Sequence, residues 1–220
     1  MTAPLLTAPL LTLAAYLIGA FPTSYLVGRA YGYDLRREGS GNLGSTNAYR
    51  VLGFFPAVGV LVVDLLKGFV PVWLFPMWDG RAGGAWALAY GLAAISGHVW
   101  PAYTGFRGGK GVATAAGTMA ALVPVAVIVA FFVWVVTVIL TRTASMASLL
   151  SAALVPIMAR GSAAPRSVVS YALLIAIAVW WTHRSNLARI ARREEFQVDW
   201  RRGRLPRRER AARKSPEDET

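Results

Sequence analysis

The chain has 220 residues, of which 55% are hydrophobic and only 15% are charged, and its mean hydropathy is +0.47. A soluble domain carries roughly 25% charged residues, so this composition, with its long apolar runs, predicts an integral membrane protein. The absence of cysteine excludes disulfides and thiolate chemistry, and two histidines make a His-rich metal site unexpected. The net charge of +12 suits an anionic substrate and an anionic lipid surface.

Five apolar runs are predicted to be membrane spans. They cover residues 5–29, 51–77, 85–100, 144–159 and 167–183. Pro22 is expected to kink or open the first span. Residues 112–140 contain no charge, and one straight helix of that length would be about 43 Å long, whereas a hydrocarbon core is about 30 Å thick.

The basic loops predict the orientation of the chain. By the positive-inside rule, the loops at 29–50 and 107–110, Arg142 and the C-terminal segment all belong on the cytoplasmic side. This requires residues 112–140 to go out and come back, as two passes or as a re-entrant hairpin broken near 122–124. The sequence therefore predicts an all-α polytopic membrane protein with seven transmembrane or half-spanning helices, N-terminus outside and C-terminus inside.

The charge distribution divides the chain into two parts. Residues 1–195 are predicted to form a membrane-embedded domain, and residues 196–220 a charged cytoplasmic tail that is partly disordered. Residues 184–220 supply twelve basic and seven acidic side chains, so the residues before them hold eleven basic and only four acidic ones. The membrane domain is therefore itself positive. No basic residue precedes the first apolar run, so we do not expect a cleaved signal peptide.

A polar, glycine-rich stretch at 39–50 separates the first two spans. Three glycines within six residues let the backbone turn tightly and present its N–H groups. Neutral hydroxyls and amides beside a permanently charged guanidinium suit a phosphate. The candidate phosphate ligands are Ser40, Gly41, Asn42, Gly44, Thr46, Asn47 and Arg50. The alternative is a solvated connection between two helices.

A second glycine-rich loop lies at 107–111, at the start of an uncharged helix. A helix N-terminus attracts an anion, and a lysine there adds a point charge. The candidates are Gly108, Gly109, Lys110, Gly111 and Thr114. The nucleotide pattern G-x-x-x-x-G-K-[ST] fails, because Thr104 stands in place of its first glycine and Gly111 in place of its hydroxyl residue. The alternative is a simple interfacial lysine.

His183 and Asn186 lie three residues apart, on one face of the last helix as it leaves the membrane. An imidazole and an amide at that level can hydrogen-bond a hydroxyl or a phosphate. The alternative is an interfacial histidine that extends toward the headgroups. His98 is expected to have a structural role.

Two further pairs are spaced three residues apart. Asp64 and Lys67 lie inside the second span, where an intrahelical ion pair is the default interpretation, although Lys67 could still face the site. Ser145 and Ser148 lie at the start of a helix on the cytoplasmic side, and helix capping accounts adequately for one of them.

These motifs resemble those of the bacterial acyl-phosphate:glycerol-3-phosphate acyltransferases, membrane enzymes of phospholipid synthesis. The resemblance runs from about residue 16 to 195 and is carried by residues 39–47 with Arg50, and by 97–101 with 108–114. Residues 64–68 also fit, as does a C-terminal set: Thr141, Arg142, Ser145, Ser148, His183, Asn186, Arg189 and Glu195. This sequence departs from the family at Ser45, usually alanine, at Thr143, commonly tyrosine, and at Arg193, frequently glycine.

The resemblance implies transfer of a fatty acyl group from acyl phosphate to the 1-hydroxyl of sn-glycerol 3-phosphate, giving lysophosphatidate and phosphate. The catalytic residues would be Ser40, Arg50, Lys110, His183 and Asn186. The substrate-binding residues would be Lys67, Ser145, Ser148 and the remaining candidates of the two loops. The attacking hydroxyl's proton could go to His183 or to a substrate phosphate oxygen.

The same resemblance implies the protein's setting. It would be a multi-pass protein of the bacterial plasma membrane with its active site at the cytoplasmic face. We expect a monomer in contact with membrane lipids, with no cofactor, no metal and no nucleic-acid partner.

A transporter or flippase for a phosphorylated solute or lipid is the competing function. Basic loops and glycine-broken helices would suit such a protein as well. The polar groups are predicted to gather at one membrane face, and no paired internal repeat is evident, which favours the enzyme.

The orientation can be tested with single cysteines, because the chain has none of its own. We expect a cysteine replacing Thr2 to be labelled by an impermeant reagent from outside, and one replacing Ser215 only from inside. Labelling of both positions from the same side would contradict the seven-segment topology.

Overall fold

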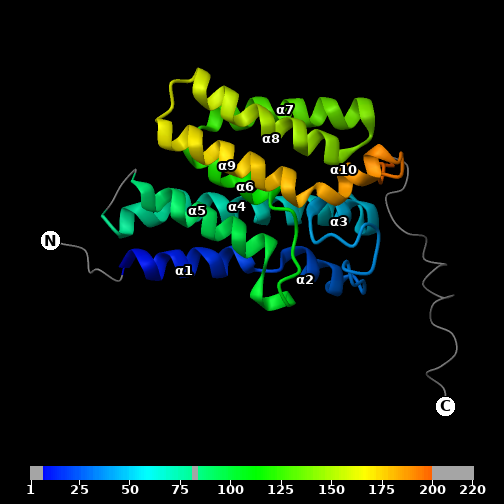
Figure 1. The fold of residues 1–220 in the computed structure, drawn as a ribbon. Helices are drawn as coiled ribbons and strands as arrows, with labels where there is room; N and C mark the ends of the chain where they lie inside the picture. Colours follow the sequence, from blue (N-terminus) through cyan, green and yellow to red (C-terminus); the bar gives the residue numbers. More distant parts are fainter. Residues whose placement is uncertain (1–6, 81–83, 200–220) are drawn as a thin grey trace, which may run out of the picture.

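The computed structural model describes residues 7–80 and 84–199, and within these ranges every regular element is a helix (Figure 1). The elements are α1 (Thr7–Ala20), α2 (Thr23–Ala30), α3 (Ser45–Leu52), α4 (Phe54–Trp78), α5 (Ala85–Val99), the 3₁₀ turn η1 (Ala102–Thr104), α6 (Val112–Leu122), α7 (Pro124–Thr141), α8 (Ala144–Gly161), α9 (Arg166–Thr182) and α10 (Arg184–Ala191). The predicted all-α fold is confirmed.

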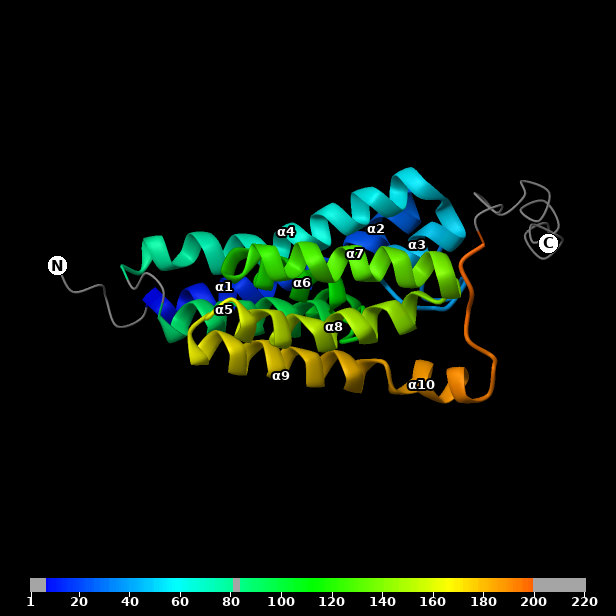
Figure 2. The same cartoon turned by 90° about the horizontal axis from the view of Figure 1, so that it is seen from above.

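The long helices form an elongated bundle in which α1, α4, α5, α7, α8 and α9 lie along one direction (Figures 1 and 2). Within residues 7–80 and 84–199, four stretches are long and apolar enough to cross a membrane: Thr7–Ala30, Phe54–Trp78, Pro124–Thr141 and Ala144–Gly161. Large apolar side chains such as Phe132, Leu140 and Ile177 remain more than 60% exposed on the bundle surface, where a bilayer would cover them.

The first apolar run is broken where the sequence predicts. α1 ends at Ala20 and α2 begins at Thr23, with Phe21 and Pro22 between them. Proline has no N–H to donate to the preceding turn, so the helix cannot continue unbroken through it.

The uncharged stretch 112–140 is also divided, as its length requires. α6 ends at Leu122, and α7 begins at Pro124, a residue favoured in the first turn of a helix. Lys110, just before α6, donates a hydrogen bond to Asn186. Ser145, just after α7, donates to Glu195, and Glu195 also accepts a hydrogen bond from Asn186. The chain therefore leaves one end of the bundle and returns to it, and the single-helix alternative is wrong.

Small residues allow α6 to pack closely on α4. A Cβ at Gly68 would overlap the carbonyl of Thr114, and one at Gly117 would overlap the carbonyl of Leu65. Close backbone contact at small residues is how helices gain packing energy in a membrane, where lipid competes equally for apolar side chains.

The first polar loop contains a helix that the sequence analysis treated as loop and span. α3 begins at Ser45 and ends at Leu52, and α4 then starts at Phe54 instead of the predicted residue 51. Gly53 makes this turn possible because its φ is 93°, a value that side chains strongly disfavour. α3 buries Asn47, Ala48 and Val51 against the rest of the protein.

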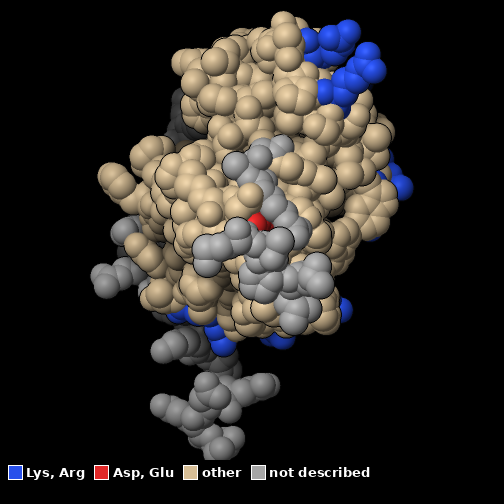
Figure 3. All heavy atoms as spheres, turned by 90° about the vertical axis from the view of Figure 1, so that its left-hand side faces the viewer, with Lys and Arg blue, Asp and Glu red and all other residues tan. Residues whose placement is uncertain are grey.

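Figure 1 shows α3, α10 and the α7–α8 turn toward the right-hand end of the bundle, and the connection between α5 and α6 below its middle. The opposite end, seen in Figure 3, shows mostly uncharged side chains with a few basic ones at its rim. Arg160 and Arg166 flank the α8–α9 turn, whereas Asp79, after α4, is buried and accepts a hydrogen bond from Tyr90. The labelling positions Thr2 and Ser215 lie outside the described residues.

The beginning of the predicted tail packs against the helices. The N–H of Val198 donates to the carbonyl of Arg142 at 2.7 Å, and its side chain is buried with Val138, Ala144 and Ala147. The predicted boundary at residue 196 therefore falls inside a segment that contacts the bundle. Residues 200–220 of that tail lie outside the described residues.

Candidate active site

The first loop is shaped by the side chain of Asn47. Its Oδ1 accepts the N–H of Ser40 at 2.8 Å, and its Nδ2 donates to the carbonyls of Leu35 and Glu38 at 3.1 and 3.0 Å. The side chain is fully buried. Both amide hydrogens are thus used within the loop, so Asn47 holds the loop's shape and is not placed to donate to a ligand as the sequence analysis expected.

The glycines of this loop serve the same turn. Gly39 and Gly41 have φ values of 60° and 71°, which glycine adopts without strain. Gly44 is the N-cap of α3, and Thr46 lies in the first turn of that helix. The side chain of Asn42 lies against Gly44, because a Cβ on Gly44 would be 2.9 Å from Asn42 Nδ2.

The second loop is held by the end of α5. The N–H of Gly108 donates to the carbonyl of Val99 at 3.2 Å, and that of Gly109 to the carbonyl of His98 at 3.1 Å. Both N–H groups therefore have carbonyl partners within the protein. Gly111 has a φ of 81° and caps the start of α6. On the other side, Thr182 Oγ1 donates to the carbonyl of Lys110 at 3.0 Å.

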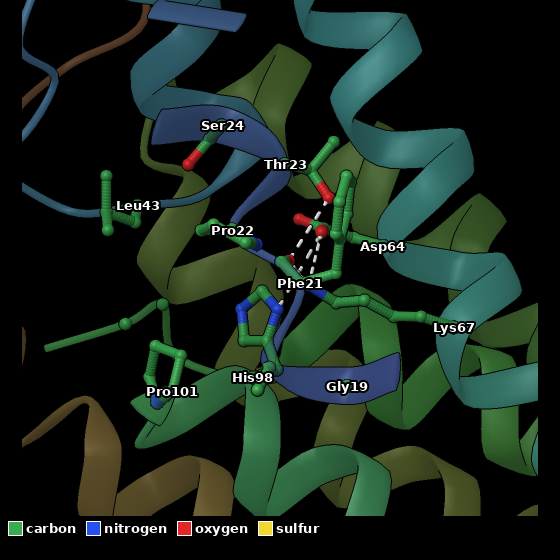
Figure 4. A pocket seen from close by; sticks show the side chains of 13 residues that line it. Gly19, Phe21, Pro22, Thr23, Ser24, Leu43, Asp64, Lys67, His98 and Pro101 are labelled. Atoms are coloured by element: carbon green, nitrogen blue, oxygen red, sulfur yellow. Dashed lines mark hydrogen bonds and ion pairs between the residues drawn. The ribbon is translucent and has the colours of Figure 1, made fainter. Parts of the chain in front are cut away.

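The two loops meet at Gly109. A Cβ on this residue would lie 2.8 Å from the carbonyl oxygen of Leu43, in the first loop. Leu43, Gly108 and Gly109 also line one small cavity, which is shown in Figure 4. The two glycine-rich loops are therefore in contact.

A polar cluster joins the second loop to three later segments. Lys110 Nζ donates to Asn186 Oδ1, and Asn186 Nδ2 donates to Glu195 Oε1 at 2.6 Å. The same Glu195 oxygen accepts from Ser145 Oγ at 3.1 Å, and Arg189 Nε donates to Glu195 Oε2 at 2.9 Å. Ser145, Asn186 and Arg189 therefore donate to one carboxylate, that of Glu195. Lys110 is linked to it through Asn186.

Arg50 approaches this cluster from α3. Its Nη2 donates to the carbonyl of Phe196 at 3.2 Å, and its Nη1 lies 3.5 Å from Ser40 Oγ. The centre of the Phe196 ring lies 5.6 Å from the guanidinium carbon of Arg50 and 5.3 Å from that of Arg189. The Nε of Arg50 is buried and has no hydrogen-bond partner within the described residues. Three cationic side chains thus surround one carboxylate, which leaves an excess of positive charge for an anionic ligand.

Burial changes the protonation of these groups. It lowers the pKa of Lys110 to about 8, an effect that Glu195 opposes and that Arg189 and Arg50 increase. Burial also lowers the pKa of Arg50, although a guanidinium stays protonated at any physiological pH.

His183 is neutral at pH 7. Burial and the charge of Lys110 lower its pKa to about 4. Its Nδ1 lies 2.8 Å from the carbonyl of Val179, which can only accept, so Nδ1 carries the proton. The lone pair is therefore on Nε2, and the ring can act as an acceptor or a base.

Three other predicted residues lie apart from the polar cluster. Lys67 Nζ is paired with Asp64 Oδ1 at 2.8 Å, as the default interpretation predicted. Thr114 is fully buried where α6 packs on α4. Ser148 Oγ donates to the carbonyl of Ala144 at 2.8 Å and accepts from Trp134. Neither Ser145 nor Ser148 caps α8, whose N-cap residue is Thr143, so the capping interpretation is wrong.

Comparisons with known proteins identify the family. A family model described as glycerol-3-phosphate acyltransferase matches residues 9–193. The chain belongs to the glycerol-3-phosphate acyltransferase family. Two proteins of that name are similar along most of their length. The one from Rubrobacter xylanophilus is 42% identical over 88% of this chain and 96% of its own, and the one from Halalkalibacterium halodurans is 41% identical over 82% and 90%.

Two crystal structures share the fold of this acyltransferase. Both are of PlsY (YgiH), an integral membrane glycerol 3-phosphate acyltransferase, one in the glycerol 3-phosphate form and one in the lysophosphatidic acid form. Their TM-scores are 0.82 and 0.81, with 33% and 32% identity, and they cover 87% of this chain and 96% and 95% of their own. The protein is therefore an acyltransferase of phospholipid synthesis in an integral membrane fold.

Glu195 is the residue that the predicted site set lacked. It was noted in the family resemblance, but Arg193, in place of a frequent glycine, made its role uncertain. The structure keeps Arg193 at a φ of 61°, the conformation that glycine favours, and Glu195 still reaches Ser145, Asn186 and Arg189. Nothing in the local sequence separates Glu195 from its neighbour Glu194, so the family resemblance was its only signal.

The lowered pKa of Lys110 predicts an alkaline limb in the pH profile. Since kcat/KM reports ionisations of the free enzyme, it should fall by up to roughly tenfold per pH unit above about pH 8, as Lys110 loses its proton. The activity that remains in Lys110→Arg should lack this limb, because a guanidinium keeps its charge. A wild-type profile that stays flat to about pH 10 would contradict the assignment.

Proposed function

We propose that this enzyme transfers a fatty acyl group from acyl phosphate to the 1-hydroxyl of sn-glycerol 3-phosphate. The products would be lysophosphatidate and inorganic phosphate. The observation that carries the proposal is the convergence of Arg50, Lys110 and Arg189 around the single carboxylate of Glu195. Both proposed substrates carry phosphate, and a site with excess buried positive charge suits them. The ligands named for the two PlsY structures are the proposed acceptor and product.

The proposed reaction is a direct displacement. The glycerol oxygen forms a bond to the acyl carbon, and the bond from that carbon to the phosphate oxygen breaks. The proton leaves the attacking hydroxyl for His183 Nε2 or for an oxygen of the departing phosphate. Acyl phosphate is a mixed anhydride with a good leaving group, so placing the reactants and neutralising charge can supply most of the catalysis.

We propose that Ser40 binds phosphate and is not a nucleophile. Arg50 Nη1 lies 3.5 Å from the hydroxyl oxygen of Ser40, and the N–H of Ser40 donates to Asn47 Oδ1. A serine nucleophile needs an adjacent base, whereas the contact described for Ser40 Oγ is with the guanidinium of Arg50, which cannot accept a proton. An acyl group trapped on Ser40 of the wild-type enzyme would refute direct transfer.

We further propose that the site faces the cytoplasm in a seven-segment topology. The segments would be α1 with α2, α4, α5, α6, α7, α8 and α9, the shorter ones being half-spanning. The two glycine-rich loops, the start of α8 and α10 lie at one end of the bundle and carry most of its basic residues, which the positive-inside rule assigns to the cytoplasm. We expect a monomer that needs no cofactor.

A transporter of a phosphorylated solute or lipid remains the alternative. Its binding site would lie near the bilayer midplane, between broken helices. The cationic cluster lies instead beyond the ends of α8 and α9, which favours the enzyme. Acyl transfer by the purified protein in detergent, where no gradient exists, distinguishes the two functions.

The donor can be tested directly. Lysophosphatidate should form from acyl phosphate and glycerol 3-phosphate with neither ATP nor acyl-CoA present. Thiol reagents should leave the rate unchanged, because the chain has no cysteine. A strict requirement for ATP or for a CoA thioester would exclude acyl phosphate as the donor.

The two loops can be tested by removing their fixed charges. Arg50→Ala and Lys110→Ala should each lower kcat/KM at least about 100-fold, equivalent to about 2.7 kcal/mol of lost transition-state stabilisation. Arg50→Lys should recover little, because a point charge cannot replace a bidentate guanidinium.

Arg107→Ala is the matched control, because Arg107 is an exposed basic residue in the same loop as Lys110. It should stay within about threefold of the wild type. Wild-type kinetics for Arg50→Ala and Lys110→Ala together would eliminate the two-loop site.

A further inference from the structure

A second buried polar cluster lies against the second loop, outside the site described above. It consists of Asp64 and Lys67 from α4 and His98 from α5 (Figure 4). Asp64 Oδ1 lies 2.8 Å from Lys67 Nζ and 3.8 Å from His98 Nδ1, and the three side chains are at most 6% exposed. Ionisable groups inside an apolar bundle are costly, so a set that the reaction does not use calls for an explanation.

The lysine of this cluster is tied to the break between α1 and α2. Lys67 Nζ donates to the carbonyl of Phe21 at 3.2 Å, directly before Pro22. The same carbonyl accepts the N–H of Thr23 at 2.9 Å, and the ammonium supplies a second donor at the break. The Asp64–Lys67 pair is therefore fixed to a point on α1 as well as to α4.

The histidine of this cluster supports the second loop. The carbonyl of His98 accepts the N–H of Gly109, and a Cβ on Gly109 would overlap His98 Nε2. The loop backbone therefore lies directly against the imidazole, whose other nitrogen faces Asp64 and has no hydrogen-bond partner within the described residues. Replacing or moving this ring changes the surface on which Gly109 rests.

The next residue after Gly109 is Lys110. Its carbonyl is held by Thr182 at the end of α9, and its ammonium by Asn186 of α10. The lysine is therefore held between α5, through Gly109, and the α9–α10 segment. A shift of the loop by about 1 Å would misplace a charge whose catalytic value depends on its position.

We propose that Asp64, Lys67 and His98 are positioning residues for acyl transfer: together they set the place of Gly109 and so direct the Lys110 ammonium to the substrate phosphate. They touch no substrate. The proposal rests on the proposed role of Lys110, and it gives Lys67 a different task from the phosphate binding that the sequence analysis considered. His98 thus has more than the purely structural role expected of it.

The test is a double-mutant cycle between His98 and Lys110. We expect His98→Ala to lower kcat/KM for glycerol 3-phosphate about tenfold in the wild-type background, and less than about twofold in the Lys110→Ala background. A residue that acts only through Lys110 has nothing left to position once the ammonium is gone. Asp64→Asn, which keeps the side-chain volume, should show the same coupling and serves if His98→Ala does not fold.

Asp79→Asn is the matched control. Asp79 is also buried and hydrogen-bonded, but it lies at the opposite end of the bundle, with Tyr90. Its variant should lower the Tm in detergent and leave kcat/KM of the folded enzyme within about twofold in both backgrounds. His98→Gln, whose amide reaches toward the Nε2 position, should recover most of the activity lost in His98→Ala.

Two results would overturn the proposal, and they are distinguishable. Equal losses from His98→Ala with and without Lys110, or no loss at all, would remove the positioning role and leave the proposed function intact. Wild-type kinetics for Lys110→Ala alone would remove both, because Lys110 would then bind no phosphate.

Discussion

The carboxylate of Glu195 is the contact on which the site depends. It accepts hydrogen bonds from Ser145 of α8, Asn186 of α10 and Arg189 of the same helix, and through Asn186 it also reaches Lys110. Like charges confined in a buried site repel strongly, so three cations could not be kept together without an anion among them. One acidic side chain thus allows the protein to hold three basic side chains close together.

The rest of the bundle brings these groups to one level. Prolines and glycines break the apolar helices, and each break leaves backbone groups that need partners inside the bundle. The Phe21 carbonyl accepts from Lys67 Nζ and from the N–H of Thr23, and the carbonyls of His98 and Val99 accept the N–H groups of Gly109 and Gly108. Because the same contacts tie helix ends to the glycine-rich loops, satisfying the backbone also fixes the geometry of the site.

The sequence predicted what depends on length and covalent geometry. The breaks near Pro22 and Val123 follow from a proline and from a helix too long for a bilayer, and both are present. It could not predict which partners the polar groups choose. The amide of Asn47 was a candidate phosphate donor, but the carbonyls of Leu35 and Glu38 accept its hydrogens. Glu195 was left out of the predicted site because Arg193 replaces a frequent glycine before it, and its contacts with Ser145 and Arg189 depend on the fold.

Phe196 gives the site a property that no charged residue supplies. Its ring lies beside the guanidinium groups of Arg50 and Arg189, and only Arg189 reaches the carboxylate of Glu195. A flat apolar ring cannot be displaced by water and cannot neutralise a cation. Its cation–π contacts attract both guanidinium groups without adding a negative charge, so the ring helps to hold two arginines together while the net charge of the cluster stays positive.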